Sequence, residues 1–298
     1  MQKHAYMIVA HNQFFLLQKL CQLLDDPRND LFIHIDAKVN DFDPKMLTSA
    51  VKYSEITFVD RISISWGGMS MVRCELLLLK AAMDHSEYSY FHLISGVDLP
   101  LKNVDTICNF FEMNSGKEFI HFCTNQFCES DAVVDRARLY YFLQEKAGRG
   151  PNLLSYIQKI DLIAQKVLGV DRRKKLGKTV ACGSQWFSIT QALAKYILEQ
   201  ESWIISHFNN TLIPDEMFLQ TLVGGTPFED HLYLTDEKGD YRSCLRYVDW
   251  RRGNPYVFRS VDFDDLIRSP YLFARKFDLN VDAQIVEKIY NHLKGSSE

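Results

Sequence analysis

The chain has 298 residues, 47% of them hydrophobic and 24% charged, and a formal net charge of −4. This composition is typical of a globular protein with one large domain or two small ones. The slightly acidic balance provides no basic field for nucleic acid, and no apolar run is long enough to span a membrane.

Short apolar runs alternate with helical periodicity through the first half of the chain. We expect strands at residues 5–10, 31–35, 56–59, 90–94 and 119–122, and helices at 12–24, 70–83, 104–113, 153–168 and 191–199. Strands and helices in alternation predict an α/β fold whose mainly parallel sheet is flanked by helices.

Polar residues follow three of the expected strands, and ligands of parallel sheets bind beyond these carboxyl ends. His11 follows the first strand, Asp36 the second and Asp98 the fourth. A polar residue in this position also serves as a turn former, and for His11 the two interpretations are equally strong. Three such ends on one sheet favour a binding site there.

A basic cluster with the sequence DRRKKLGK, residues 171–178, follows the expected helix at 153–168. Cations in this position suit anionic lipid headgroups. The simpler interpretation is a solvated helix end, where positive charge complements the helix dipole.

The segment IPDEMF, residues 213–218, places Asp215 and Glu216 after a proline and before an apolar run. Proline suits the first position of a helix, and acids there complement the helix dipole. Taken alone, the pattern predicts a helix start. The alternative is that one of the two acids is a catalytic base.

Seven cysteines are scattered along the chain without a CxxC pair. Such a set indicates neither a zinc site nor a disulfide framework, so buried free thiols are expected. The start of the chain, MQKHAYMIVAHNQ, has too short an apolar core for a secretory signal. Together these features predict a cytoplasmic protein in a reducing compartment.

A series of short segments runs through the chain in a fixed order: AYMIVAHN, FIHIDAK, SWGGMSMVRCELLLLKAAM, SGVDLPLK, GSQWFSIT, PDE, YVDW, FRS and FARKFDLNVD. In content and order this series resembles the core-2/I-branching N-acetylglucosaminyltransferase family, which also contains the peptide O-xylosyltransferases. The resemblance implies a GT-A type nucleotide-sugar transferase fold with a Rossmann-like sheet, in one domain over residues 1–298. Residues 1–125 would form the nucleotide-sugar-binding half. Residues 126–298 would form the acceptor-binding and catalytic half, with a C-terminal diphosphate-binding tail.

The resemblance also implies an activity, the inverting and metal-independent transfer of a sugar from a UDP-sugar to a glycan hydroxyl. Branching members move N-acetylglucosamine in β linkage to a 6-hydroxyl, and UDP-xylose is the alternative donor. Inversion needs one carboxylate to take the acceptor proton and positive charge to stabilise the departing diphosphate. No cofactor or metal ion is then expected.

Family motifs assign these roles to particular residues. Glu216 in PDE matches the base, and Arg259 in FRS and Lys276 in FARKFD match the two diphosphate-binding cations, with Arg275 one position from Lys276. The remaining matches are softer. Donor contacts are expected at His11, Asp36 and Asp98, and acceptor contacts at Trp250, Trp186, Arg136 and Arg138.

Two other functions remain open on the sequence. One is a non-catalytic UDP-sugar-binding partner protein with a transferase fold. The other is a metal-dependent transferase that uses Asp98, although the segment Ser95 to Asp98 offers one acid where such enzymes have an Asp-x-Asp pair. A bacterial, cytoplasmic enzyme would use an acceptor made there, such as a lipid-linked saccharide for a surface polysaccharide. Residues 172–175 would then face the membrane.

Overall fold

The computed structural model describes residues 2–235 and 239–295, and its centre is a six-stranded sheet. Four strands are parallel: β1 (His4–Ala10), β2 (Asn29–Ile35), β3 (Ile56–Phe58) and β4 (Tyr90–Ser95). The sheet continues through β7 (Phe187–Thr190), which is antiparallel to β4 and to the edge strand β6 (Phe119–Ile120). The strand order is β3-β2-β1-β4-β7-β6.

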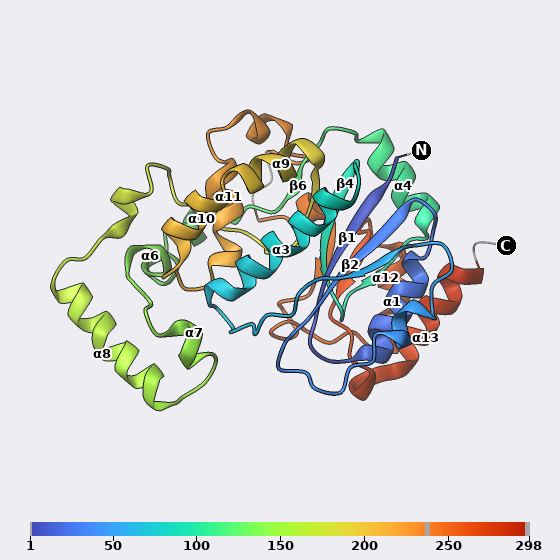
Figure 1. Cartoon of the computed structure of the whole chain (residues 1–298), viewed down its shortest axis with the longest axis horizontal. Helices are drawn as coiled ribbons and strands as arrows, with labels where there is room; N and C mark the ends of the chain where they lie inside the picture. The colour runs from blue at the N-terminus through green and yellow to red at the C-terminus, as the bar shows by residue number, and fades with distance from the viewer. Residues whose placement is uncertain (1, 236–238, 296–298) are drawn as a thin grey trace.

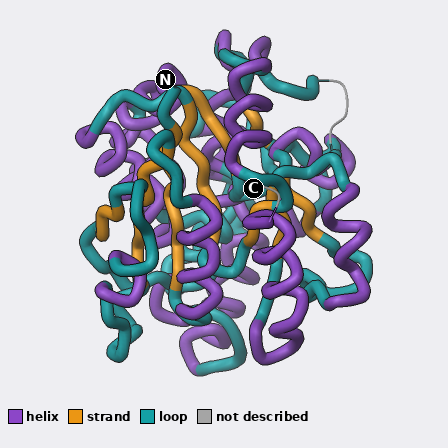
Figure 2. The backbone as a smooth tube through the Cα atoms, turned by 90° about the vertical axis from the view of Figure 1, so that its right-hand side faces the viewer, coloured by secondary structure: helices purple, strands orange, loops and turns teal. Residues whose placement is uncertain are grey.

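Both faces of this sheet are covered by helices, so alternate residues of each strand enter different cores. Met7 and Phe32 belong to one apolar cluster, and Ile8 and Ile33 to the other. The first cluster includes residues of α3 (Met69–His85), α9 (Gln191–Glu199), α10 (Glu201–Phe208) and α11 (Phe218–Val223). The second includes residues of α1 (Phe14–Leu24), α2 (Lys45–Thr48), α4 (Val104–Met113), α12 (Phe263–Arg268) and α13 (Leu279–Gly295). Figures 1 and 2 show these two helical layers and the strands between them.

A small second sheet brings the C-terminal tail to the carboxyl end of β4. Its order is β5-β9-β8, formed by β5 (Leu99–Pro100), β9 (Phe273–Arg275) and β8 (Arg246–Val248). The fully buried Arg246 joins the two sheets, because its guanidinium donates to the carbonyls of Leu93 and Phe187 at 3.3 and 2.9 Å. The tail therefore meets the strand ends where the sequence predicts a binding site.

A long segment between β6 and β7 lies at one end of the molecule (Figure 1). It contains α5 (Asn125–Cys128), α6 (Asp131–Arg138), α7 (Gln144–Ala147), α8 (Leu153–Val167) and the 3-10 helix Arg172–Lys175. Further 3-10 helices occupy Pro214–Glu216, Pro227–His231, Tyr241–Cys244 and Ser260–Asp262. Among the helices described, none is long and apolar enough to cross a membrane.

The expected strands and helices are present, with small shifts at their ends. The strand predicted at 119–122 stops at Ile120, and the helix predicted from residue 12 begins at Phe14. A larger difference concerns residues 213–218. Pro214–Glu216 forms a 3-10 helix, and the α-helix itself begins at Phe218.

The prediction that all cysteines are free thiols is wrong. Cys128 in α5 and Cys182 before β7 form a disulfide, with their Cα atoms 6.0 Å apart and a sequence separation of 54. The two cysteines lie at the two ends of the long segment, so their spacing in the sequence does not predict the disulfide. The five free cysteines are Cys21, Cys74, Cys108, Cys123 and Cys244, all buried except the half-buried Cys123.

The basic cluster is also not a uniformly solvated helix end. Arg172 is buried, and its guanidinium donates to the carbonyl oxygens of Leu139 and His207, both at 3.0 Å, and to the hydroxyl of Thr211. Arg173 pairs with Asp171 at 2.6 Å. Only Lys174 and Lys175 of the four cations are fully exposed. Arg172 therefore holds the long segment against α10 rather than facing outwards.

Candidate active site

Glu216 ends a 3-10 helix that is fixed from both sides of its backbone. Ile213, in the left-handed region with φ 53°, turns the chain into Pro214, and its carbonyl accepts from the Glu216 amide at 3.3 Å. The Glu216 carbonyl accepts from the Gly183 amide at 2.8 Å. The Glu216 side chain is 39% exposed. The carboxylate is therefore both firmly positioned and open to a substrate.

Arg136 of α6 binds this carboxylate directly. Its Nη1 atom lies 3.0 Å from Oε2 of Glu216. Burial raises the pKa of Glu216, and the neighbouring Arg136 opposes that rise by favouring the ionised form. The structure thus brings one of the two predicted acceptor-side arginines to the predicted base.

Arg138 is engaged elsewhere. Its Nη2 atom lies 2.6 Å from Asp135, which also pairs with Lys166 at 2.5 Å. Two residues apart on a helix, Arg136 and Arg138 project in different directions. The pairing of Arg138 with its own helix gives no support for an acceptor contact, which stays a prediction.

Two further acids lie beneath Glu216. Asp215 is buried, and burial together with the charge of Glu216 raises its pKa to about 7. Glu75 of α3 is buried as well, and its Oε1 accepts from Gln185 at 2.8 Å. Burial, then the charge of Asp215, raises the pKa of Glu75. Glu75 was not among the predicted site residues, although a single acid within the apolar run CELLLLK indicates a special role.

Arg275 points into the site from β9. Its guanidinium carbon lies 4.2 Å from the centre of the Trp186 ring, and its Nε is 3.5 Å from Oδ1 of Asp98. Its charge also acts on Glu216, where it favours the carboxylate. Trp186 is 6% exposed, so it forms the floor under Arg275 rather than an open acceptor platform. The cation one position before Lys276 is therefore the one on the Glu216 side.

The carboxylate of Asp98 forms its hydrogen bonds within its own turn. Its carboxylate accepts from the amide of Ser95 at 3.0 Å and from the Ser95 hydroxyl at 2.5 Å. Burial raises its pKa, and Arg275 opposes the rise. Within residues 2–235 and 239–295, no group of three or more His, Cys, Asp or Glu side chains is arranged to hold a metal ion.

Asp36 shows the same turn-forming geometry at the end of β2. Its Oδ1 accepts from the Lys38 amide at 2.9 Å, and its Oδ2 is 3.6 Å from the Lys38 ammonium. His11 follows β1, and partial burial lowers its pKa; the charge of Asp36 opposes this, while Lys38 and Lys276 lower the pKa further. These residues converge at the strand ends, as the sequence predicts, while their roles toward a donor stay predictions.

Arg259 and Lys276 lie on adjoining segments. The Lys276 carbonyl accepts from the amide of Phe258 at 3.0 Å, which brings residue 259 beside the end of β9. Arg259 is exposed and precedes the 3-10 helix Ser260–Asp262, where its amide donates to Asp262 at 2.8 Å. The two predicted diphosphate-binding cations are thus brought together by the fold.

An aromatic row borders the other side of Glu216. Trp250 is 49% exposed, and its ring N–H donates to the Tyr241 hydroxyl at 2.9 Å. Tyr241 stacks on His121 with ring centres 4.2 Å apart, and burial raises the pKa of its hydroxyl, with a smaller contribution from the charge of Glu216. Tyr241 and His121 were not singled out by the sequence, because neither sits in a matched motif. Their role here depends on contacts distant in the chain.

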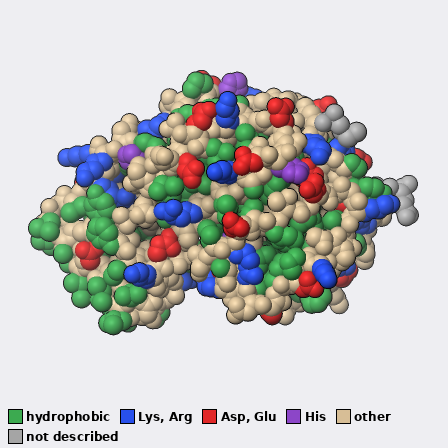
Figure 3. Space-filling model, in the orientation of Figure 1, with side chains coloured by type: hydrophobic (Ala, Val, Ile, Leu, Met, Phe, Trp, Pro, Cys, Tyr) green, Lys and Arg blue, Asp and Glu red, His purple; other side chains and the backbone are tan. Residues whose placement is uncertain are grey.

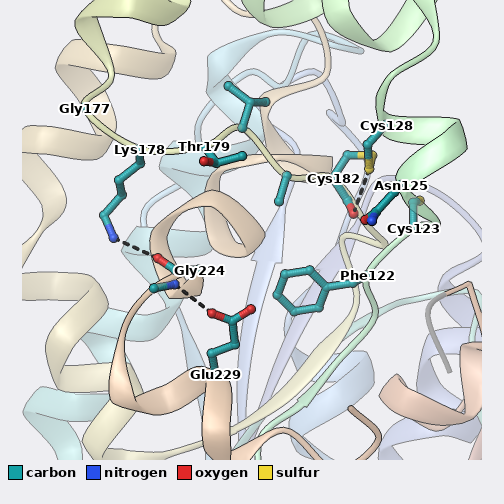
Figure 4. A pocket seen from close by; sticks show the side chains of 13 residues that line it. Phe122, Cys123, Asn125, Cys128, Gly177, Lys178, Thr179, Cys182, Gly224 and Glu229 are labelled. Atoms are coloured by element: carbon teal, nitrogen blue, oxygen red, sulfur yellow. Dashed lines mark hydrogen bonds between the residues drawn. A yellow bond between two sulfur atoms is a disulfide. The ribbon is translucent and has the colours of Figure 1, made fainter. Parts of the chain in front are cut away.

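A cavity of about 610 Å³ is lined by residues that follow β6 and precede β7, together with Gly224, Gly225 and Glu229 (Figure 4), and Glu216 is not among them. Cys123 and Cys182 line this cavity, and the Cys182 carbonyl accepts from the Cys123 amide at 2.8 Å. The next residue, Gly183, donates its amide to the backbone carbonyl of Glu216. Across the cavity, Lys178 donates to the carbonyl of Gly224 at 3.2 Å, and Glu229 accepts from the Gly225 amide at 2.8 Å. The walls are thus a mixture of backbone polar groups and side chains, which suits a hydroxyl-rich ligand.

Comparisons with known proteins show what the chain is similar to. Rat xylosyltransferase 2 is 25% identical over 312 residues, covering 98% of this chain and 34% of the relative, and rat xylosyltransferase 1 is 22% identical over 310 residues, covering 98% and 35%. The chain thus spans about a third of the length of these curated relatives. A crystal structure of mouse xyloside xylosyltransferase 1 in its apo form overlaps with a TM-score of 0.38 at 10% identity, over 92% of this chain and 97% of that one.

The profile of one enzyme family matches residues 4–138 and 158–263, which is most of the chain and includes Arg136, Glu216 and Arg259. The family and the mainly parallel sheet flanked by helices together confirm the predicted α/β fold of GT-A type. The chain belongs to the Core-2/I-Branching enzyme family.

Proposed function

We propose that this chain is an inverting glycosyltransferase that moves a sugar from a UDP-sugar to a hydroxyl of a glycan acceptor. One observation carries the proposal. A single accessible carboxylate, Glu216, is held by Arg136 at 3.0 Å and is also acted on by the strand-end cation Arg275.

Glu216 has the properties of a general base. A base must be ionised at working pH yet retain affinity for a proton. Burial raises its pKa, and Arg136 and Arg275 restrain the rise. The acceptor hydroxyl would give its proton to Glu216 as its oxygen attacks the anomeric carbon, and UDP would leave from the opposite face.

Positive side chains would stabilise the departing diphosphate in place of a metal ion. Arg259 and Lys276 lie on adjoining segments, and arginine offers phosphate a bidentate fork while lysine offers a mobile charge. We assign Arg275 a positioning role, because its guanidinium is engaged with Trp186 and Asp98.

The donor is proposed to be UDP-N-acetylglucosamine, with β transfer to a 6-hydroxyl as in branching members of the family. UDP-xylose is the second candidate, because the curated relatives quoted above are named xylosyltransferases. The proposed acceptor is a saccharide built for a surface polysaccharide. Trp250 and Tyr241 offer it an exposed aromatic edge on which sugar C–H groups pack.

The test measures UDP release from each of the two donors, with EDTA and with added divalent metal, for the wild type and Glu216→Gln. We expect release that resists EDTA and falls by about 100-fold or more in the variant, the usual contribution of a general base. Calorimetry should show unchanged UDP binding, because the substitution keeps the shape of the side chain.

Three results would contradict the proposal in different ways. Full activity in Glu216→Gln would show that Glu216 is not the catalytic base. Activity that requires metal would favour the mechanism through Asp98. UDP binding without turnover across a panel of saccharide acceptors would favour a non-catalytic binding protein.

A further inference from the structure

Helix α8 (Leu153–Val167) buries polar side chains and exposes apolar ones. Its two buried side chains are both glutamines, Gln158 and Gln165, whereas most of its large apolar side chains face solvent. A surface helix of a globular protein normally does the opposite and buries its apolar stripe. The apolar face of α8 therefore contributes little to the protein's own core.

Polar contacts fix α8 to the protein. Gln165 accepts from the Tyr140 amide and donates to the Tyr140 carbonyl, both at 2.8 Å. Gln158 accepts from the Leu143 amide at 3.1 Å and donates to Gln144 at 3.0 Å. These bonds satisfy backbone and side-chain groups on α7 and the chain before it, so α8 is held in one orientation.

The outer face is a continuous apolar stripe. At 3.6 residues per turn, its members project within an arc about 140° wide. Their exposed fractions run from 45% to 82%: Leu153, Tyr156, Ile157, Ile160, Ile163, Val167 and, just beyond the helix, Leu168 at 79%. Figure 3 shows hydrophobic side chains gathered at this end of the molecule. Continuous exposed apolar patches are uncommon on monomeric proteins and mark an interaction surface.

The charges around this stripe are positive. Lys159 projects from one flank of the helix beside Lys166, which pairs with Asp135 at 2.5 Å, and the exposed Lys174 and Lys175 follow the helix. In the described chain, neither Lys174 nor Lys175 forms an ion pair. The one acid of α8, Asp161, lies towards the protein and accepts from Gln165 at 2.6 Å. The stripe thus combines apolar side chains with cations at its edge.

We propose that α8 lies in the surface of an anionic membrane, with its apolar stripe at the boundary between headgroups and acyl chains. Amphipathic helices with lysines beside the apolar face bind membranes in this way. The helix has 15 residues, about 22 Å at 1.5 Å per residue, which is too short to span a bilayer but suits lying along it. Lys174 and Lys175 would meet the headgroups, whereas the buried Arg172 stays within the protein.

A second copy of the chain is the rival occupant. The helix lies at one end of the molecule (Figure 1), where a lipid surface can reach its apolar stripe. The other strongly exposed apolar side chains, such as Phe15, Met113 and Val261, are spread over different elements and provide no second stripe. The cations beside the helix would also face each other in a symmetric pair, which costs energy.

Membrane contact would have a consequence for the site, and this step rests on the proposed function. The segment held by α8 continues from α6, whose Arg136 binds Glu216. Docking through α8 would place the acceptor side of the site near the lipid. The acceptor would then be a saccharide attached to a membrane lipid.

The test is co-sedimentation of the full chain with phosphatidylcholine vesicles that contain or lack phosphatidylglycerol. The variant Ile160→Gln/Ile163→Gln/Val167→Gln should bind anionic vesicles at least about tenfold less well, because three apolar side chains no longer enter the interface. The matched control is Met113→Gln/Val261→Gln, which alters side chains that are 79% and 84% exposed on other elements and should bind like the wild type. Both should keep the wild-type melting temperature and UDP binding.

A second variant separates charge from apolar contact. Lys159→Gln/Lys174→Gln/Lys175→Gln should weaken binding to anionic vesicles by about tenfold or more and leave the weak binding to neutral vesicles unchanged. The proposal is overturned if wild type stays in the supernatant with anionic vesicles, or if the triple apolar variant binds them as wild type does. A wild-type dimer in analytical ultracentrifugation that the apolar variant dissolves would assign the stripe to a second copy instead.

Discussion

At the scale of single residues, the pair formed by Arg136 and Glu216 determines how the proposed base behaves. Burial alone would leave Glu216 protonated over a wider pH range, and Arg136 extends the range in which it is ionised. Arg136 comes from a helix whose place in the fold the family motifs do not reveal. Its proximity to Glu216 could only emerge from the structure.

The substitution Arg136→Gln should move the pH dependence of activity. Without the guanidinium, the pKa of Glu216 rises further, so the base loses its charge at a higher pH. The acidic limb of kcat/KM should therefore shift to higher pH, with activity at alkaline pH retained in part. A pH profile of UDP release measures this shift. Arg138→Gln, which breaks a pair with Asp135 in the same helix, is the control and should leave the limb in place.

Glu75 and Arg275 illustrate why the rest of the site escaped sequence analysis. Glu75 lies in an apolar helix whose sequence predicts a core element. It interacts electrostatically with Asp215, a residue 140 positions away in the chain. For Arg275 and Lys276, the motif does identify a pair of cations. The motif does not indicate which of the two cations faces Trp186, because this depends on the position of β9 in the fold.

At the scale of elements, the buried strands were predictable because each is a nearly continuous apolar run. Helices with a buried apolar stripe, such as α3, were predictable for the same reason. The 3-10 helix at Pro214–Glu216 and the disulfide between Cys128 and Cys182 were not, since both are set by contacts between distant segments. Helix α8 has the correct period in sequence, but its period does not tell which face is buried.

Arg172 gives an element-scale prediction about stability. Its guanidinium satisfies the carbonyls of Leu139 and His207 at 3.0 Å each, so it joins the long segment to α10. Arg172→Gln should lower the free energy of unfolding by about 1.5–3 kcal/mol, the usual worth of hydrogen bonds from a charged donor. Chemical denaturation measures the loss. The control Lys175→Gln changes an exposed cation of the same 3-10 helix, and an equal loss there would contradict this role for Arg172.

At the scale of the whole molecule, the site adds a pH-dependent cost to folding. The pKa of Asp215 is raised from 3.8 to about 7, so the folded chain holds a proton that the unfolded chain releases between these values. Protein stability contributed by this group therefore falls as pH rises through that window. A buried acid that is retained despite such a cost is typical of a functional site.

Asp215→Asn should remove this dependence. The variant should gain stability relative to wild type as pH rises from about 4 to above 7, by on the order of 1 kcal/mol for each unit of pKa shift that is relieved. Thermal unfolding at several pH values measures the difference between the two proteins. The exposed Asp230→Asn serves as the control. A constant difference between wild type and Asp215→Asn across the window would contradict the argument.

The disulfide has a consequence for how the protein can diversify. Its two cysteines bring the start and the end of the long segment to within 6.0 Å, measured between Cα atoms, so the segment leaves the sheet and returns at nearly one point. A loop closed in this way tolerates changes of length cheaply, because each doubling costs only about 0.6 kcal/mol of closure entropy. The family profile is interrupted at residues 139–157, within this segment, while the sheet and the base match on either side. Residues 139–157 can thus vary in length at little cost, while the matched segments on either side, which include Arg136 and Glu216, stay in place.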